Sequence, residues 1–133
     1  MDKDIFLLRL HEKWKCSLTF GWIPITGDQS FLNTEIYQSE YLNHYFGEIK
    51  AAIKNIYDLT LLFELREDGQ FEVLDIDQCR FTYDGNEYIY SDKELNFLLY
   101  FLHEGTTTIG GELLLNEIHK IWPEYSNHIW KSN

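Results

Sequence analysis

The chain has 133 residues, of which 44% are hydrophobic and 25% charged, a composition typical of one globular domain and unlike that of a disordered segment. Acidic residues outnumber basic ones 22 to 11, and the resulting net charge of −11 argues against binding to nucleic acid or to an anionic membrane surface. No apolar run approaches the roughly 18 residues of a membrane-spanning helix. The N-terminus lacks the basic start of a signal peptide, so we expect a cytoplasmic location.

The first part of the chain is expected to alternate between helical and extended segments. Apolar residues at helical spacing indicate a helix over 4–15, with a strand as the alternative. Residues 16–25 are expected to be extended, and 26–33 to form a loop. Ser39 is predicted to cap a helix over 39–57. The apolar side chains that recur along one face of this helix are Leu42, Tyr45, Phe46, Ile49, Ala52, Ile53 and Ile56.

Residues 59–90 alternate apolar and polar side chains and predict four antiparallel strands. The first turn is expected over 67–69, with Gly69 in the left-handed conformation. This register pairs Leu65 with Phe71 and Phe63 with Val73. We expect a bulge at Val73–Leu74, because the apolar parity changes there. A second hairpin, turning at Gly85 and Asn86, would pair Tyr83 with Tyr88 and Phe81 with Tyr90.

The last part of the chain is predicted to hold two helices. Ser91 and Glu94 fit a capping box, and Gly105 would end the helix that follows. Gly110 and Gly111 would open the last helix, which Pro123 ends. His103 and His119 would then lie near the C-terminal ends of these helices. The sequence therefore predicts an α+β fold over a single domain, 1–133, with an antiparallel meander of four to five strands and helices on one face.

No residue pattern predicts a catalytic or metal site. His44 and Glu48 are one helical turn apart but lack a third ligand. Asp75 and Asp77 would share one face of a strand like paired catalytic acids, but a solvated face is the expected role. We therefore predict that the chain is not an enzyme and holds no cofactor or metal. Cys16 and Cys79 are expected to be reduced and buried, with a disulfide between them as the alternative.

The distribution of charge is the most distinctive feature of the sequence. Residues 1–57 carry a net charge of −1, whereas residues 58–94 hold 11 acids and 3 bases, a net charge of −8. We predict that the hairpins present an acidic face to a basic protein partner, with a solubilising sheet edge as the alternative. The candidate binding residues are Glu64, Glu67, Asp68, Glu72, Asp75, Asp77, Asp84 and Glu87. Tyr88 or Trp130 would serve as an aromatic anchor, unless it is buried in the core.

In size, acidity and its aromatic content of 17%, the chain resembles small bacterial immunity proteins, which neutralise a cognate toxin. It is also similar in charge to phage-encoded anti-defence proteins. The resemblance covers the whole chain but no motif carries it, so it assigns no site residue. It implies an inhibitory binding protein whose partner is basic, such as a toxin nuclease domain. A non-catalytic subunit or adaptor of a larger assembly and a small enzyme are the alternatives, and no oligomeric state is indicated.

Overall fold

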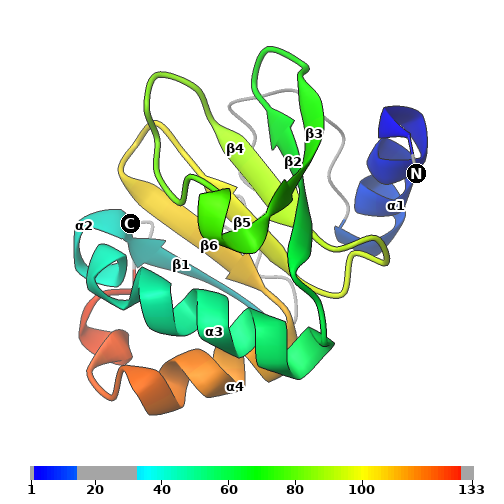
Figure 1. Cartoon of the computed structure of the whole chain (residues 1–133). Helices are drawn as coiled ribbons and strands as arrows, with labels where there is room; N and C mark the ends of the chain where they lie inside the picture. The colour runs from blue at the N-terminus through cyan, green and yellow to red at the C-terminus, as the bar shows by residue number, and fades with distance from the viewer. Residues whose placement is uncertain (1, 15–32, 130–133) are drawn as a thin grey trace.

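The computed structural model describes residues 2–14 and 33–129. These residues form an α+β fold, in which a six-stranded antiparallel sheet has helices on both faces (Figure 1). The predicted α+β class is confirmed, and the sheet has slightly more strands than the expected four to five. The expected extended stretch 16–25 and most of the loop 26–33 lie outside the described residues.

The sheet has the strand order β1-β6-β5-β4-β2-β3, so β1 and β3 are its edges. Its strands are β1 (Thr34–Gln38), β2 (Leu61–Arg66), β3 (Phe71–Asp75), β4 (Tyr88–Ser91), β5 (Leu98–Phe101) and β6 (Thr106–Gly110). The α-helices are α1 (Lys3–Trp14), α2 (Ser39–Leu42), α3 (Phe46–Tyr57) and α4 (Glu112–Ile121). Short 3-10 turns occupy Asn43–Tyr45, Ile76–Gln78 and Tyr125–Asn127. None of the helices in the described ranges is long and apolar enough to span a membrane.

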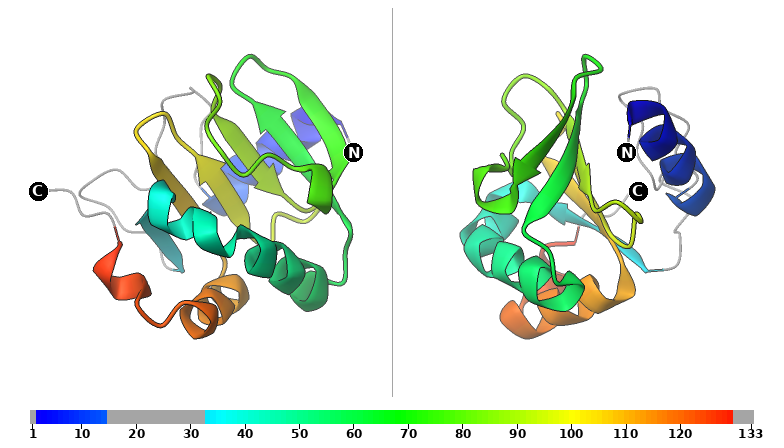
Figure 2. Two further views of the ribbon diagram at one scale, coloured as in Figure 1. Left: turned by 60° about the vertical axis from the view of Figure 1, so that its left-hand side comes forward. Right: turned by 45° about the vertical axis from the view of Figure 1, so that its right-hand side comes forward.

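Two apolar clusters lie on opposite faces of the sheet. Helices α3 and α4 cover one face, and α1 covers the other (Figure 2). The α1 side chains Phe6 and Leu10 are completely buried there, with Phe6 against Phe63 and Phe71. The helix expected near the N-terminus is therefore confirmed, but the expectation that all helices share one face is wrong.

The helix predicted after Ser91 is wrong, because the chain leaves β4 at Ser91 and forms a turn and then β5. Leu98 and Tyr100 belong to the cluster beneath α1, whereas Leu99 and Phe101 belong to the cluster beneath α3 and α4. A strand buried on both faces has the same uniformly apolar sequence as a buried helix. Gly105, at φ +78°, turns the chain from β5 into β6, so His103 lies in a hairpin turn and not at a helix end.

The hairpin formed by β2 and β3 has the predicted register. Leu65 pairs with Phe71 and Phe63 with Val73, and Gly69 has φ +94°. The bulge expected at Val73–Leu74 is wrong, since the ladder continues unbroken to the pair of Leu61 and Asp75. The apolar parity changes because Phe71 packs on the cluster beneath α1, whereas Leu74 packs on the cluster beneath α3 and α4. After β3 ends at Asp75, the buried Ile76 begins a 3-10 turn.

The second predicted hairpin is also wrong. Residues 79–87 form a loop with no strand, so the ladder that would pair Tyr83 with Tyr88 and Phe81 with Tyr90 does not form. Strand β4 pairs with β2 on one side and with β5 on the other. Residues 59–90 therefore contain three strands, and not a four-stranded meander.

The two helices predicted over 39–57 and after Gly111 agree better with the structure. The helix expected over 39–57 is present as α2, a 3-10 turn and α3. Its N-cap is Gln38, and the Ser39 hydroxyl instead lies 2.7 Å from the Thr107 hydroxyl of β6. The last helix, α4, is confirmed between Gly111 and Pro123. Strand β1, which precedes α2, was not expected.

Two glycine substitutions should change stability in opposite directions. Gly111 has φ +120°, and a Cβ there would lie 3.1 Å from the Phe97 Cβ, so Gly111→Ala should cost about 1–3 kcal/mol. Gly47 lies in α3 with open space around its Cα, so Gly47→Ala should stabilise the fold by about 0.5–1 kcal/mol. Urea unfolding of both variants measures the two effects. Equal shifts of the same sign would contradict this assignment.

Candidate partner-binding surface

The eight candidate acids fall into three groups that differ in burial and in partners. Glu64 and Glu87 are only 3% and 1% exposed. Asp68, Asp77 and Asp84 are each paired with a basic side chain. Glu67, Glu72 and Asp75 are exposed and have no cation within ion-pair distance in the described part of the chain.

Glu64 is held in the interior by a tyrosine of the neighbouring strand. The Tyr90 hydroxyl donates to Glu64 Oε2 at 2.5 Å and accepts the backbone N–H of Arg80 at 3.0 Å. Burial and the hydrogen bond to Glu64 raise the pKa of Tyr90, so the phenol stays protonated as a donor. Glu64 was expected on the acidic face that the hairpins present, but it is buried because the loop 79–87 closes over its face of the sheet.

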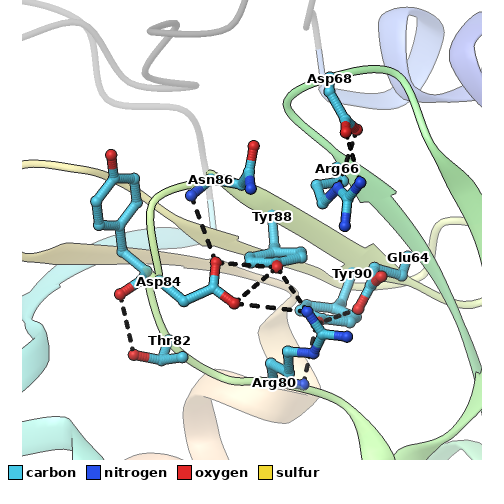
Figure 3. Close-up of polar contacts among 10 residues, drawn as sticks. Glu64, Arg66, Asp68, Arg80, Thr82, Asp84, Asn86, Tyr88 and Tyr90 are labelled. Carbon is cyan, nitrogen blue, oxygen red and sulfur yellow. Dashed lines mark hydrogen bonds and ion pairs between the residues drawn. The ribbon is translucent and has the colours of Figure 1, made fainter.

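The same loop is tied to β4 through Tyr88 (Figure 3). The Tyr88 hydroxyl donates to both Asp84 carboxylate oxygens, at 3.0 and 2.9 Å, and accepts from Arg80 Nη1 at 3.1 Å. Arg80 Nη1 also lies 3.5 Å from Asp84 Oδ2. Tyr88 is completely buried, so the core role weighed against its role as an anchor is the one observed. Trp130 lies outside the described residues.

Glu87 connects three parts of the sheet. Its carboxylate accepts from the Tyr100 hydroxyl at 2.7 Å and from the His103 N–H at 3.1 Å, and it lies 2.5 Å from His103 Nδ1. Its own backbone N–H donates to Glu67 Oε1 at 2.8 Å. This arrangement fixes the β2–β3 turn, the start of β4 and the β5–β6 turn to one another. Glu87 is thus placed to hold the fold together and not to touch a partner.

Three exposed acids are neutralised locally. The Arg66 guanidinium hydrogen-bonds to Asp68 and lowers the pKa of that carboxyl to about 2. Lys54 of α3 lies 2.8 Å from Asp77, and Arg80 pairs with Asp84 as described above. Asp77 lies in a 3-10 turn, so it does not share a strand face with Asp75 as expected. These pairs reduce the negative field that their carboxylates would otherwise project.

The remaining acids, Glu67, Glu72 and Asp75, all lie on the β2–β3 hairpin, and we call them the acidic edge. The hairpin is at the edge of the sheet, and its turn points away from α3 and α4 (Figure 1). Two apolar side chains on the same hairpin are exposed, Leu61 at 52% and Val73 at 48%. The hairpin therefore combines carboxylates that form no ion pair with exposed apolar surface.

The sequence pattern did not predict that Leu61 and Val73 would be exposed on this hairpin. Leu61 and Val73 alternate with polar residues in the same way as core residues do, so their pattern indicates burial. Val73 is exposed on the edge strand β3, which has a partner on only one side, and Leu61 lies beyond the ladder between β2 and β4. The short, strongly charged segment around Val73 is the signal typical of an edge strand.

A second polar constellation lies beside α4. Glu35 of β1 accepts from the Tyr37 hydroxyl and lies 2.7 Å from His119 Nε2, and the His119 ring stacks on Tyr125. Glu35 and His119 border an open pocket of about 240 Å³. No group of three or more His, Cys, Asp or Glu side chains within 2–14 and 33–129 is arranged to hold a metal ion. Cys79 is a buried free thiol whose pKa is raised by burial to about 12, and Cys16 lies outside the described residues.

Comparison of this chain with protein families, with curated proteins and with solved structures finds no match.

The pair of His103 and Glu87 should make stability depend on pH. The hydrogen bond to Glu87 raises the pKa of His103 above its ordinary value of 6.5. The pair therefore stabilises the fold fully below about pH 6.5, and this stabilisation is lost as pH rises through the folded pKa. The free energy of urea unfolding should fall between pH 6 and pH 9 more steeply in the parent protein than in His103→Gln. Parallel pH profiles would show that the pair has no such role.

Proposed function

We propose that this chain is a small non-catalytic protein that binds and neutralises a basic protein partner, as an immunity protein neutralises a toxin nuclease. The acidic edge is the observation that supports this function best. Its three carboxylates are exposed and form no ion pair among the described residues, whereas the other five candidates are buried or paired.

Uncompensated charge at a protruding edge acts at long range. It accelerates association with a surface of opposite sign, and this acceleration weakens as salt rises. The exposed side chains of Leu61 and Val73 add apolar area at the same hairpin, where desolvation on contact would supply affinity. The β2–β3 hairpin could therefore both accelerate association through its charge and supply affinity through its apolar side chains.

Affinity capture tests the proposal. The full chain, immobilised through its C-terminus, is exposed to lysate of the native host at low salt, and retained proteins are eluted with high salt and identified by mass spectrometry. We expect a basic protein whose own activity, measured after purification, is inhibited by the chain at equimolar concentration. Capture of acidic proteins that resist high salt, or a partner whose activity is unaffected, would contradict the proposal.

A further inference from the structure

Strand β3 is an edge of the sheet and pairs only with β2 among the described residues. The hydrogen bonds from Arg66 N to Gln70 O and from Ile76 N to Thr60 O mark the two ends of its ladder with β2. Antiparallel pairing alternates, so Glu72 and Leu74 direct their N–H and C=O groups toward β2. Phe71 and Val73 direct theirs away from the sheet. Within the described ranges, no strand pairs with this outer side of β3.

The two edges of the sheet differ in this respect. At the opposite edge, the Gln38 N–H donates to His128 O and Tyr37 forms a bridge with Ile129, so the chain itself covers part of β1. The side chains beside the open β3 backbone are the exposed Val73 and the charged Glu72 and Asp75. An exposed strand edge is a template for pairing with another chain.

We propose, on the basis of the proposed function, that the basic partner adds an extended segment to β3 as a further antiparallel or parallel strand. Main-chain hydrogen bonds to Phe71 and Val73 would supply affinity in this mode of recognition. Lysine or arginine side chains of the segment would lie beside Glu72 and Asp75, where opposite charges across strands stabilise pairing. A second copy of this chain would instead bring its own acidic residues against them, and like charges oppose such pairing.

One substitution can block this edge without touching the ladder to β2. Val73→Pro removes an N–H that points outward, and proline is tolerated on edge strands when its missing N–H faces solvent. Val73→Thr is the matched control, because it keeps the N–H and strand propensity but removes apolar surface. The probe is a synthetic peptide of lysine and threonine with lysines on both faces of the extended strand, because Glu72 and Asp75 lie on opposite faces of β3. It is titrated into isotope-labelled protein at low salt and followed by NMR.

In the parent protein, we expect the peptide to shift the Phe71 and Val73 amide signals and to slow their hydrogen exchange. Its affinity should fall by about ten-fold or more in Val73→Pro and by less than about two-fold in Val73→Thr. A peptide of the same sequence, N-methylated at its four central residues, keeps the charge but cannot pair, and should bind the parent protein about ten-fold or more weakly than the unmethylated peptide does. This comparison does not depend on whether Val73→Pro folds.

The outcomes separate this inference from the proposed function. Equal binding of the methylated and unmethylated peptides, with salt dependence, would overturn strand addition and leave the acidic edge as a charged binding surface. Absence of any peptide binding at low salt would also overturn it. Dimerisation of the parent protein through β3, detected by analytical ultracentrifugation and abolished in Val73→Pro, would show that a second copy is the occupant and would contradict the proposal.

Discussion

Replacement of Glu87 by alanine is expected to destabilise the fold by about 3 kcal/mol, because it removes the acceptor of several buried or half-buried donors. The Tyr100 hydroxyl, on a side chain that is 1% exposed, would lose the 2.7 Å hydrogen bond that Glu87 accepts. The His103 backbone N–H and ring would also lose this carboxylate. The loss should be seen as a lower midpoint in urea with little change in slope.

Glu87→Gln provides the control for this effect. The amide keeps one carbonyl oxygen that can accept from Tyr100, so its cost should be smaller than that of alanine. Glu94→Ala, at an exposed position in the turn before β5, should stay within about 0.5 kcal/mol of the parent protein. A Glu87→Ala variant as stable as Glu94→Ala would show that the network around Glu87 contributes nothing to folding.

Neutralisation of the acidic edge is expected to slow association with the partner by about ten-fold at low ionic strength. The triple variant Glu67→Gln, Glu72→Gln, Asp75→Asn removes three charges but keeps side-chain oxygens. Those oxygens can still accept from the Glu87 N–H and from the Asp77 N–H at 2.9 Å. The slope of the on-rate against salt should become shallower in the same variant, as measured by surface plasmon resonance.

A second triple variant controls for net charge alone. Glu48→Gln, Glu94→Gln and Glu112→Gln remove the same number of charges from exposed positions on α3, the β4–β5 turn and α4. At about 0.1–0.15 M salt this variant should associate within about two-fold of the parent rate, because surface charges beyond the Debye length of roughly 8–10 Å at that ionic strength are largely screened. If both variants slow association equally, the net charge of the protein matters and the acidic edge has no special role.

Local sequence signals predicted the parts of the fold that depend on neighbouring residues. The turn at Gly69 set the β2–β3 register, because a glycine in the left-handed conformation fixes both the loop length and the pairing. The apolar stripe of α3 and the start of α4 after Gly111 were likewise readable from spacing and caps.

The segments that were predicted wrongly depend on contacts with residues distant in the sequence. Residues 97–102 are apolar on every side, and only the presence of β4 and β6 beside them makes a strand of them. The tyrosines at 88 and 90 were assigned to a hairpin ladder, but in the fold their hydroxyls bind the loop that was expected to be its other strand. No signal within either segment distinguishes these outcomes.

In the candidate site too, some features follow from the local sequence and others depend on long-range contacts. The count of charges along the chain identified the acidic segment correctly, but it could not separate the free carboxylates from the occupied ones. Asp77 is paired with Lys54, which lies 23 residues earlier in α3, and Glu87 is bound by Tyr100 of β5 and by His103 of the β5–β6 turn. Exposure and charge compensation are properties of the tertiary structure, so only Glu67, Glu72 and Asp75 remain as the acidic edge.

Hydrogen–deuterium exchange of the complex with the captured partner tests most directly whether this hairpin is the binding surface. The account predicts that the partner slows exchange in the peptides that cover 61–75, with little change in those that cover α3 and α4. Protection confined to α3 and α4, with 61–75 exchanging as in the free protein, would contradict it.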